Sequence, residues 1–368
     1  MAVPGLSGSN GGVGSIYTSL PKIKLNYEDI ISEYNFPLDI SYFVNNICNL
    51  KCKHCYVAYQ NKNDKLNVNQ WKELFNSLIN MGALTFGNVG KEPLLSWETT
   101  KKLLEFLQVK RKINELLRFG LVTNGTLFNE EIINSLIKIS PDYIDISLDG
   151  DKAAHDNIRG VGNFEILINN LTKISDKYLL SKIFIIYTIN KTTIGSVSKA
   201  IDIIHNLGIN NVLFSPYVTL NKNDELYLSD DTYCSFFEKM YNGEIIDFSK
   251  YNDLTIYLKN DYTTTLGIMN KLIDKNLINL EELIIDEYGV IFNEYIIKNN
   301  KLIFNYIPFD NSYKQMIRIS HDGYIGNCFD MFFDTYTERT IGNIKNQDIR
   351  EILSNAKQKI EEKELIYR

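Results

Sequence analysis

Three cysteines lie within eight residues of one another, at Cys48, Cys52 and Cys55. Thiolates at this spacing can wrap one metal centre, and soft sulfur ligands favour zinc or an iron–sulfur cluster. A structural zinc site needs four ligands, and His54 is poorly placed to be the fourth because it lies between two of the others. Three thiolates on a four-iron cube leave one iron open, which a reactive cluster needs. A purely structural metal site is the alternative.

Polar residues recur after the later predicted strands. An acidic group such as Asp149 can accept hydrogen bonds from sugar hydroxyls. The planar guanidinium of Arg159 can hold a carboxylate through two parallel hydrogen bonds. Taken singly, these segments are also compatible with ordinary turns or helix caps. The polar segments that follow the strands are Gly90–Pro93, Thr123–Thr126, Ser147–Gly150 and His155–Gly160.

The C-x3-C-x2-C spacing, with the aromatic His54 before its last cysteine, resembles the radical S-adenosylmethionine (SAM) superfamily. The resemblance covers about residues 38–215 and implies that Cys48, Cys52 and Cys55 hold one [4Fe–4S] cluster. The open iron would chelate the amine and carboxylate of SAM. An electron from the cluster would then cleave SAM to a 5′-deoxyadenosyl radical, which abstracts hydrogen from a substrate.

The same resemblance implies roles for the segments that follow the strands. His54 and Phe214 would pack near the adenine of SAM. Gly90 and Glu92 would bind its amino group through backbone carbonyls and a carboxylate. Lys91 stands where the family has the second glycine of a Gly-Gly-Glu-Pro segment, so the local backbone is expected to differ.

Four more residues complete the SAM site that the resemblance implies. Asn124 would line the pocket, and Ser147 and Asp149 would contact the ribose hydroxyls or nearby SAM atoms. Arg159 would hold the SAM carboxylate.

Short apolar runs alternate with longer amphipathic ones between residues 38 and 215, which predicts a parallel sheet covered by helices. Right-handed crossovers wind such a chain into a doubly wound sheet or a complete or partial barrel. The resemblance implies an α/β fold with a partial (β/α)6 barrel. The predicted strands are Leu38–Val44, Leu84–Val89, Phe119–Thr123, Tyr143–Leu148, Lys182–Ile189 and Asn211–Ser215. The predicted helices are Val68–Met81, Thr99–Leu117, Asn129–Ile139, Asn163–Tyr178 and Ile194–Leu207.

The rhythm of the sequence divides the chain into three parts. Residues 1–19 are rich in Gly and Ser and predict a disordered or tag-like tail. Residues 20–217 form the (β/α)6 core, and residues 218–368 form an α+β extension. The extension is predicted to contain helical stretches, a hairpin over Met316–Cys328 with its turn at 321–323, and a helix over Ile349–Leu353.

Residues 319–328 and 341–344 resemble the opening of a SPASM or twitch domain, which carries auxiliary iron–sulfur clusters. No cysteine follows Cys328, and Cys234 is the other cysteine outside the cluster motif. A cluster needs about four protein ligands, so we expect a degenerate SPASM domain without an auxiliary cluster. Cys328 is then either a buried structural cysteine or a catalytic thiol that donates a hydrogen atom, as in radical SAM peptide epimerases. Cys234, beside two phenylalanines, is expected in the core.

The resemblance favours a peptide substrate, because the His-Asp-x-x-Arg-Gly segment occurs in radical SAM enzymes that modify peptides. Epimerisation or cross-linking of a ribosomally made precursor is the expected reaction. A flavodoxin or ferredoxin would donate electrons, and a separate protein would be one way to recognise a leader sequence. The alternatives are a small sugar or amino-acid derivative as substrate, and a non-catalytic iron–sulfur or zinc protein.

Composition excludes several other classes. The net charge is −6 with both signs interspersed, so the chain has no basic stripe for nucleic acid. No apolar run approaches the ~20 residues of a membrane span, and the N-terminus lacks the pattern of a signal peptide. Five cysteines with three in one cluster do not form a secreted disulfide framework, so a reducing cytoplasm is expected.

Overall fold

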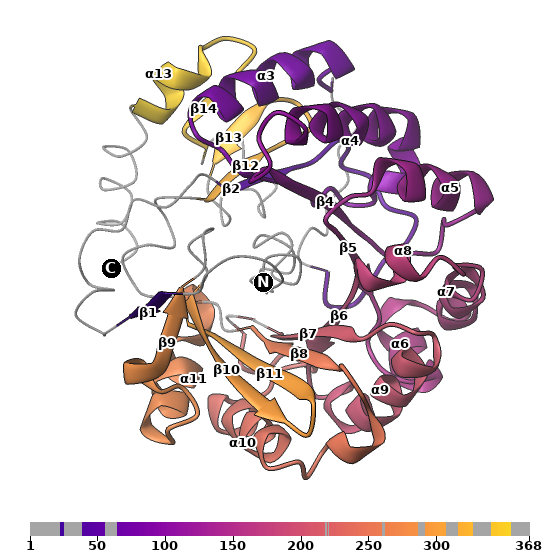
Figure 1. The fold of residues 1–368 in the computed structure, drawn as a ribbon, viewed down its shortest axis with the longest axis vertical. Helices are drawn as coiled ribbons and strands as arrows, with labels where there is room; N and C mark the ends of the chain where they lie inside the picture. The colour runs from indigo at the N-terminus through magenta and orange to yellow at the C-terminus, as the bar shows by residue number, and fades with distance from the viewer. Residues whose placement is uncertain are drawn as a thin grey trace.

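The computed structural model describes residues 23–25, 39–55, 65–217, 219, 221–259, 262–285, 291–306, 316–326 and 340–354. In these ranges the strands form one continuous mixed sheet in the order β1-β9-β10-β11-β8-β7-β6-β5-β4-β3-β2-β12-β13-β14. The sheet curves so that its strands follow an arc, with helices α3 to α9 along the outside (Figure 1). This is a partial α/β barrel with a C-terminal extension, as the sequence predicted.

Six strands of the predicted core pair in parallel with their sequence neighbours. They are β2 (Asp39–Tyr42), β3 (Thr85–Asn88), β4 (Arg118–Thr123), β5 (Tyr143–Ser147), β6 (Ile183–Ile189) and β7 (Asn211–Pro216). The helices between them are α3 (Val68–Asn80), α4 (Trp97–Arg111), α5 (Glu130–Ile139), α6 (Lys152–Arg159), α7 (Asn163–Leu171), α8 (Lys177–Ser181) and α9 (Val197–Asn206), with 3-10 turns η1 (Pro93–Ser96) and η2 (Ile194–Ser196). The single helix predicted over 163–178 is divided, because Asp176 caps a new helix through the backbone N–H of Leu179.

Helix α3 illustrates why these segments fold as they do. The side chain of Asn67 accepts hydrogen bonds from the first turn, and Gln70 accepts one from the backbone of Asn67, which together form a capping box. The residues spaced along one face of α3 are buried against the sheet: Trp71, Leu74, Phe75 and Leu78. This face packs on Tyr42 of β2 and Phe86 of β3, so the apolar periodicity fixes which side of the sheet the helix covers.

The sheet continues past residue 217 at both edges of the core. Strand β8 (Thr255–Leu258) pairs in parallel with β7, and β12 (Met316–Ile319) pairs in parallel with β2. Strand β12 forms the predicted hairpin with β13 (Tyr324–Gly326), and Gly323 in its turn adopts a φ of 91° that favours glycine. The predicted helix near residue 349 is also present. The remaining elements are β1 (Ile23–Leu25), α10 (Asp230–Tyr241), η3 (Phe248–Lys250), α11 (Tyr262–Asp274), η4 (Leu280–Glu282), β9 (Leu283–Ile285), β10 (Ile291–Ile297), β11 (Asn300–Tyr306), β14 (Gly342–Asn343) and α13 (Ile349–Ser354).

The antiparallel meander β9-β10-β11 was not expected from the sequence. Strand β10 pairs with β11 over its whole length, and β11 joins β8 in parallel. Polar and apolar residues do not alternate regularly in Ile291–Ile297 or Asn300–Tyr306, because like residues follow one another, as in Asn293-Glu294 and Leu302–Phe304. This weakens the period-two signal that identifies a strand.

The inner face of the sheet, away from α3–α9, is filled by side chains. Its apolar cluster comprises Tyr143, Phe184, Ile186, Leu213, Tyr257, Phe292 and Ile303. Three ionisable residues are buried on this face, Asp145, Lys259 and Arg318, and Asp39 of β2 is half-buried. The interior of the barrel is therefore a packed and partly charged core beneath the strand ends.

No helix in the described ranges is long and apolar enough to cross a membrane.

Candidate functional site

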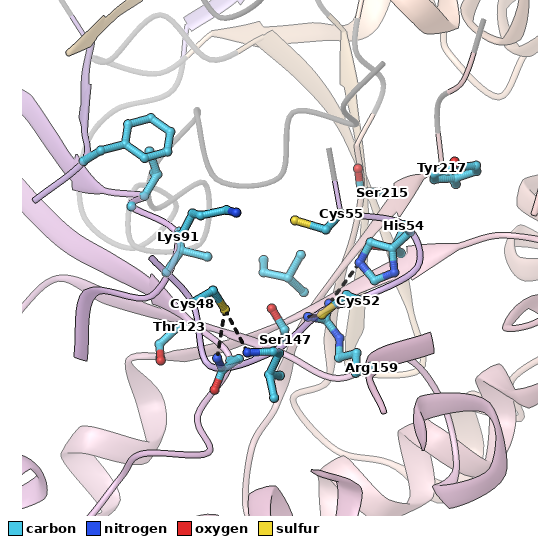
Figure 2. Close-up of a pocket in the computed structure, with 18 residues that line it drawn as sticks. Cys48, Cys52, His54, Cys55, Lys91, Thr123, Ser147, Arg159, Ser215 and Tyr217 are labelled. Atoms are coloured by element: carbon cyan, nitrogen blue, oxygen red, sulfur yellow. Dashed lines mark hydrogen bonds between the residues drawn. The ribbon is translucent and has the colours of Figure 1, made fainter. Parts of the chain in front are cut away.

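A pocket opens at the carboxyl ends of the parallel strands, where the loops after β2 to β7 converge. Its empty space is about 960 Å³ when open solvent at the mouth is included, an upper bound comparable with small-molecule sites of about 300–1,000 Å³. Figure 2 shows its side chains around one opening. Eighteen residues line it: Phe43, Cys48, Leu50, Cys52, His54, Cys55, Val89, Gly90, Lys91, Val122, Thr123, Asn124, Ser147, Arg159, Ile186, Thr188, Ser215 and Tyr217.

The three cysteines of the motif all line this pocket. Their loop follows β2 and is held by backbone hydrogen bonds, from Lys53 N–H to the carbonyl of Ile158 (2.9 Å) and from Cys55 N–H to the carbonyl of Cys52 (3.0 Å). In Figure 2 the labelled cysteines surround the opening from different sides. The loop therefore presents three thiols to one space.

Donors from its own loop and from the loop after β4 approach Cys48. Its sulfur accepts hydrogen bonds from the backbone N–H of Leu50 (3.3 Å) and from Nδ2 of Asn124 (3.8 Å). The same Asn124 amide donates to Oδ1 of Asn49 (2.9 Å), and Asn49 donates to Oγ1 of Thr126 (2.9 Å). The loop after β4 is thereby attached to the cysteine loop.

A buried ion pair supports the opposite side of the pocket. Nε of Arg159 donates to Oδ2 of Asp149 at 2.6 Å, and the backbone N–H of Thr188 donates to Oδ1 of Asp149 at 2.8 Å. The remaining nitrogens of Arg159 face the cysteine loop, with Nη1 3.8 Å from Sγ of Cys52 and Nη2 3.4 Å from Nε2 of His54. Asp149 thus orients the guanidinium from below.

These contacts set the protonation of the site. Burial acts to raise the pKa of Asp149, but Arg159 and then His54 hold it below its ordinary value. Burial lowers the pKa of His54 to about 4, so its ring is neutral at pH 7. Burial raises the pKa of the Cys48 thiol, and that of Cys52 to about 11 although Arg159 opposes the change. Metal binding would keep these thiols deprotonated.

Glu92 and Asp149 support the pocket from beneath and are not among its lining residues. Glu92 is fully buried and accepts hydrogen bonds from Leu94 N–H (3.0 Å), Thr123 Oγ1 (2.7 Å) and Asn124 N–H (2.9 Å). Burial raises its pKa to about 7. The carboxylate that the sequence analysis assigned to the SAM amino group therefore organises the loops after β3 and β4.

Phe214 is a third predicted residue that does not line the pocket. Its ring packs on Tyr187 and Phe236, on the helix-covered face of the sheet. Side chains alternate along a strand, so the neighbouring Ser215 faces the pocket, and Tyr217 follows it there. The sequence of β7 could have indicated this orientation of Phe214. Val212 and Phe214 are two residues apart, so they share the helix-covered face, and Ser215 must lie on the other face.

The predicted residues that do line the pocket are His54, Gly90, Asn124, Ser147 and Arg159, with the three cysteines. Sequence reasoning missed Asn49, which acts through its side-chain amide, and Thr188, which acts through its backbone N–H. Neither residue belongs to a motif with a recognisable spacing. Cys234 is buried, and its thiol donates to the carbonyl of Ile268 (3.5 Å). Cys328 lies outside the described residues.

The donor set fits an iron–sulfur cluster. Three soft thiols share one pocket, and N–H groups directed at their sulfurs are the hydrogen bonds that tune such clusters. Within the described ranges no three His, Cys, Asp or Glu side chains lie close enough for one common ion. In a four-iron cluster each cysteine binds a different iron, so the three thiols do not need to lie close enough to share one ion.

A family model described as the radical SAM superfamily matches residues 42–202. The chain carries a radical SAM domain. This family uses a [4Fe–4S] cluster and SAM, which agrees with the thiols and the Arg159 guanidinium that meet in the pocket.

Curated relatives of the radical SAM domain differ in their named activities. Fe-coproporphyrin III synthase of Methanosarcina barkeri is 26% identical over 189 residues, which is 50% of this chain and 45% of that protein. The antilisterial bacteriocin subtilosin biosynthesis protein AlbA of Bacillus subtilis is 28% identical over 149 residues, or 39% of this chain and 32% of AlbA. The matched regions span less than half of each relative.

Among solved structures, SuiB of Streptococcus suis bound to its precursor peptide SuiA is similar in fold. The two structures share a TM-score of 0.60 at 17% identity, over 86% of this chain and 64% of SuiB. The radical SAM domain and part of the C-terminal extension therefore have a counterpart in a known fold.

Proposed function

We propose that this radical SAM enzyme abstracts hydrogen from a peptide, in the maturation of a ribosomally made precursor. The observation that carries the proposal is the convergence of Cys48, Cys52, Cys55 and Arg159 on one pocket at the strand ends. A [4Fe–4S] cluster bound there would supply the electron for reductive cleavage of SAM.

The residues of the pocket divide the work of binding SAM. Arg159 is kept ionised and oriented by Asp149, which suits it to a carboxylate. Neutral His54 offers an uncharged ring beside it. Leu50 and Asn124 donate to the Cys48 sulfur and hold that side of the loop. Ser147, Thr188 and Ser215 line the wall with polar groups that would offer hydrogen bonds to ribose hydroxyls.

Three observations support a peptide as the substrate. Relatives include AlbA, named for bacteriocin biosynthesis, and the fold resembles SuiB, which was solved with a precursor peptide. The hairpin β12-β13, which resembles the start of a SPASM domain, lies directly beside β2 and so beside the strand that leads to the cysteine loop.

A small molecule is the second candidate substrate. Fe-coproporphyrin III synthase is matched over half of this chain, and its name indicates a porphyrin product. Phe43, Val89 and Tyr217 line the pocket and offer apolar surface to either class of substrate.

The deciding experiment incubates the reconstituted full chain anaerobically with SAM and a low-potential reductant in deuterated solvent. One arm adds a short peptide encoded beside this gene, and the other adds an iron porphyrin precursor in place of the product that the relative is named for. Release of 5′-deoxyadenosine that rises only with the peptide, together with a peptide mass change, is expected. A gain of one deuterium indicates epimerisation, and a loss of two hydrogens indicates a cross-link. A response to the porphyrin alone would overturn the peptide assignment.

Cys328→Ala separates the two roles considered for that thiol. If Cys328 donates the hydrogen atom, the variant consumes SAM but yields no deuterium-labelled peptide. Cys234→Ala serves as the matched control, because this thiol is buried away from the pocket. Unchanged labelling in Cys328→Ala would exclude the donor role.

A further inference from the structure

Lys91 occupies a fixed position next to the cysteine loop. The backbone N–H of the following residue, Glu92, donates to the carbonyl of Ile47 at 3.0 Å, one residue before Cys48. The carbonyl of Glu92 accepts from Nδ2 of Asn45 at 2.9 Å. On its other side, the backbone N–H of Gly90 donates to Oδ1 of Asn88 at 3.4 Å. The backbone that carries Lys91 is therefore held against the loop of the first cysteine.

The side chain of Lys91 extends from this backbone into the pocket. It lines the pocket together with the three cysteines, and in Figure 2 its amino end points into the opening between Cys48 and Cys55. Its charge acts to lower the pKa of the Cys48 thiol, although burial has the larger and opposite effect. The adjacent Glu92 is buried among its own three donors instead.

The two cations of the pocket differ in their surroundings. Arg159 approaches Cys52 from below, and its charge is balanced by Asp149 at 2.6 Å. Lys91 approaches from the loop after β3, on the side of Cys48 and Cys55. The two residues therefore act on different sides of the thiols.

We propose that Lys91 is an electrostatic partner of the cluster, whose positive charge raises its reduction potential. This inference rests on the cluster assigned under the proposed function. One electron passes from an external donor of the flavodoxin or ferredoxin class to the cluster, and no bond or proton changes at Lys91. The added electron makes the thiolate-bound cluster more negative, so a nearby cation stabilises the reduced form. Net charge around a cluster is one of the factors that set its potential.

The test is a redox titration of the reconstituted full chain, without substrate, followed by the electron paramagnetic resonance signal of the reduced cluster. The variants are Lys91→Met and Lys91→Gln, which remove the charge, and Lys91→Arg, which keeps it. Lys110→Met on the outer helix α4 is the control for loss of a remote charge. Each variant is first assayed for about four irons per chain.

In the two neutral variants we expect the ratio of reduced to oxidised cluster, at a fixed solution potential, to fall about tenfold. For a one-electron couple this equals a shift of about 59 mV. Lys91→Arg and Lys110→Met should titrate like the wild type. Because the signal arises only from loaded protein, incomplete reconstitution does not affect the ratio.

Three results would overturn the proposal. They are an unchanged ratio in both neutral variants, a fall in Lys91→Arg equal to that in Lys91→Met, and complete loss of iron from the neutral variants alone. The last would mean that Lys91 assembles the site and does not tune it. If the wild type itself binds no cluster, the proposed function fails instead, so the two failures are distinguishable.

Discussion

Two aspartates, one within strand β5 and one just after its end, have pKa values shifted in opposite directions. Asp145 lies within β5, and Asp149 follows the end of the same strand; both are buried. The pKa of Asp149 is lowered, because Arg159 and other partners outweigh burial. Burial raises the pKa of Asp145 to about 8, and the opposing effect of Lys259 is smaller. Burial alone does not decide whether a carboxyl group is charged.

The difference in pKa between Asp145 and Asp149 follows from where each carboxyl group lies along the barrel axis. At the carboxyl ends of the strands, backbone N–H groups and a guanidinium are directed at Asp149. Deeper on the inner face, Asp145 is surrounded by strand side chains, and Asp39 likewise has its pKa raised by burial to about 7. The strand ends thus carry a preorganised ion pair, as expected for a site, and the interior favours neutral acids.

Removal of a pocket thiol should have the largest effect. Cys52→Ala takes away a proposed cluster ligand and the sulfur that faces Arg159, so we expect loss of iron and of all 5′-deoxyadenosine formation. Chromatography of the nucleoside product and an iron assay measure these effects. Cys234→Ala should retain both and lose only about 1–2 kcal/mol of stability from core packing. Full activity in Cys52→Ala would refute the ligand assignment.

Asp149→Asn tests the strand-end half of the comparison. Arg159 would stay buried without its carboxylate, which should cost about 3–5 kcal/mol of unfolding free energy. Misorientation of the guanidinium should also reduce SAM cleavage roughly 10–100-fold. Anaerobic urea denaturation and nucleoside assays at several SAM concentrations check these values. A variant with wild-type stability and turnover would show that the ion pair does not position Arg159.

Asp145→Asn tests the interior half through pH. The folded pKa of about 8 exceeds the unfolded value near 4, so the folded state holds an extra proton between these limits. The wild type should therefore lose stability as the pH rises from about 4 to about 8. The variant should lose less, by up to about 1.4 kcal/mol per pH unit. Anaerobic urea denaturation at pH 5, 6, 7 and 8 measures both slopes, and equal slopes would contradict the raised pKa.

The parallel core was predictable from sequence because each strand is a short apolar run between amphipathic helices. The cysteines, Asn124, Ser147 and Arg159 were predictable as pocket residues because they follow those strands, and such residues meet at one edge of a parallel sheet. Alternation along β7 directs Phe214 toward the helices and Ser215 toward the pocket, and this could have been deduced from the sequence. The family resemblance instead assigned Phe214 to the adenine of SAM.

Other features depend on contacts between distant segments. The burial of Glu92 follows from donors on the loop after β4, 31 and 32 residues later in the chain. The ionisable groups Lys259 and Arg318 come to the inner face because β8 and β12 extend the sheet at its two edges. Neither residue has a local pattern that distinguishes it from a solvated surface cation. Strand pairing across such separations leaves no periodic trace in one sequence.

The pairing of β12 with β2 also has a consequence for how the chain reaches its folded state. Residues 39–42 are synthesised well before residues 316–319, the strand that covers one of their edges. Until that segment is available, the backbone amides and carbonyls at the edge of β2 are exposed to other chains. Contacts of such long sequence separation form slowly, and slow closure prolongs the exposure of intermediates that aggregate. The edge of the strand that leads to the cysteine loop is therefore covered only after residues 316–319 have been made.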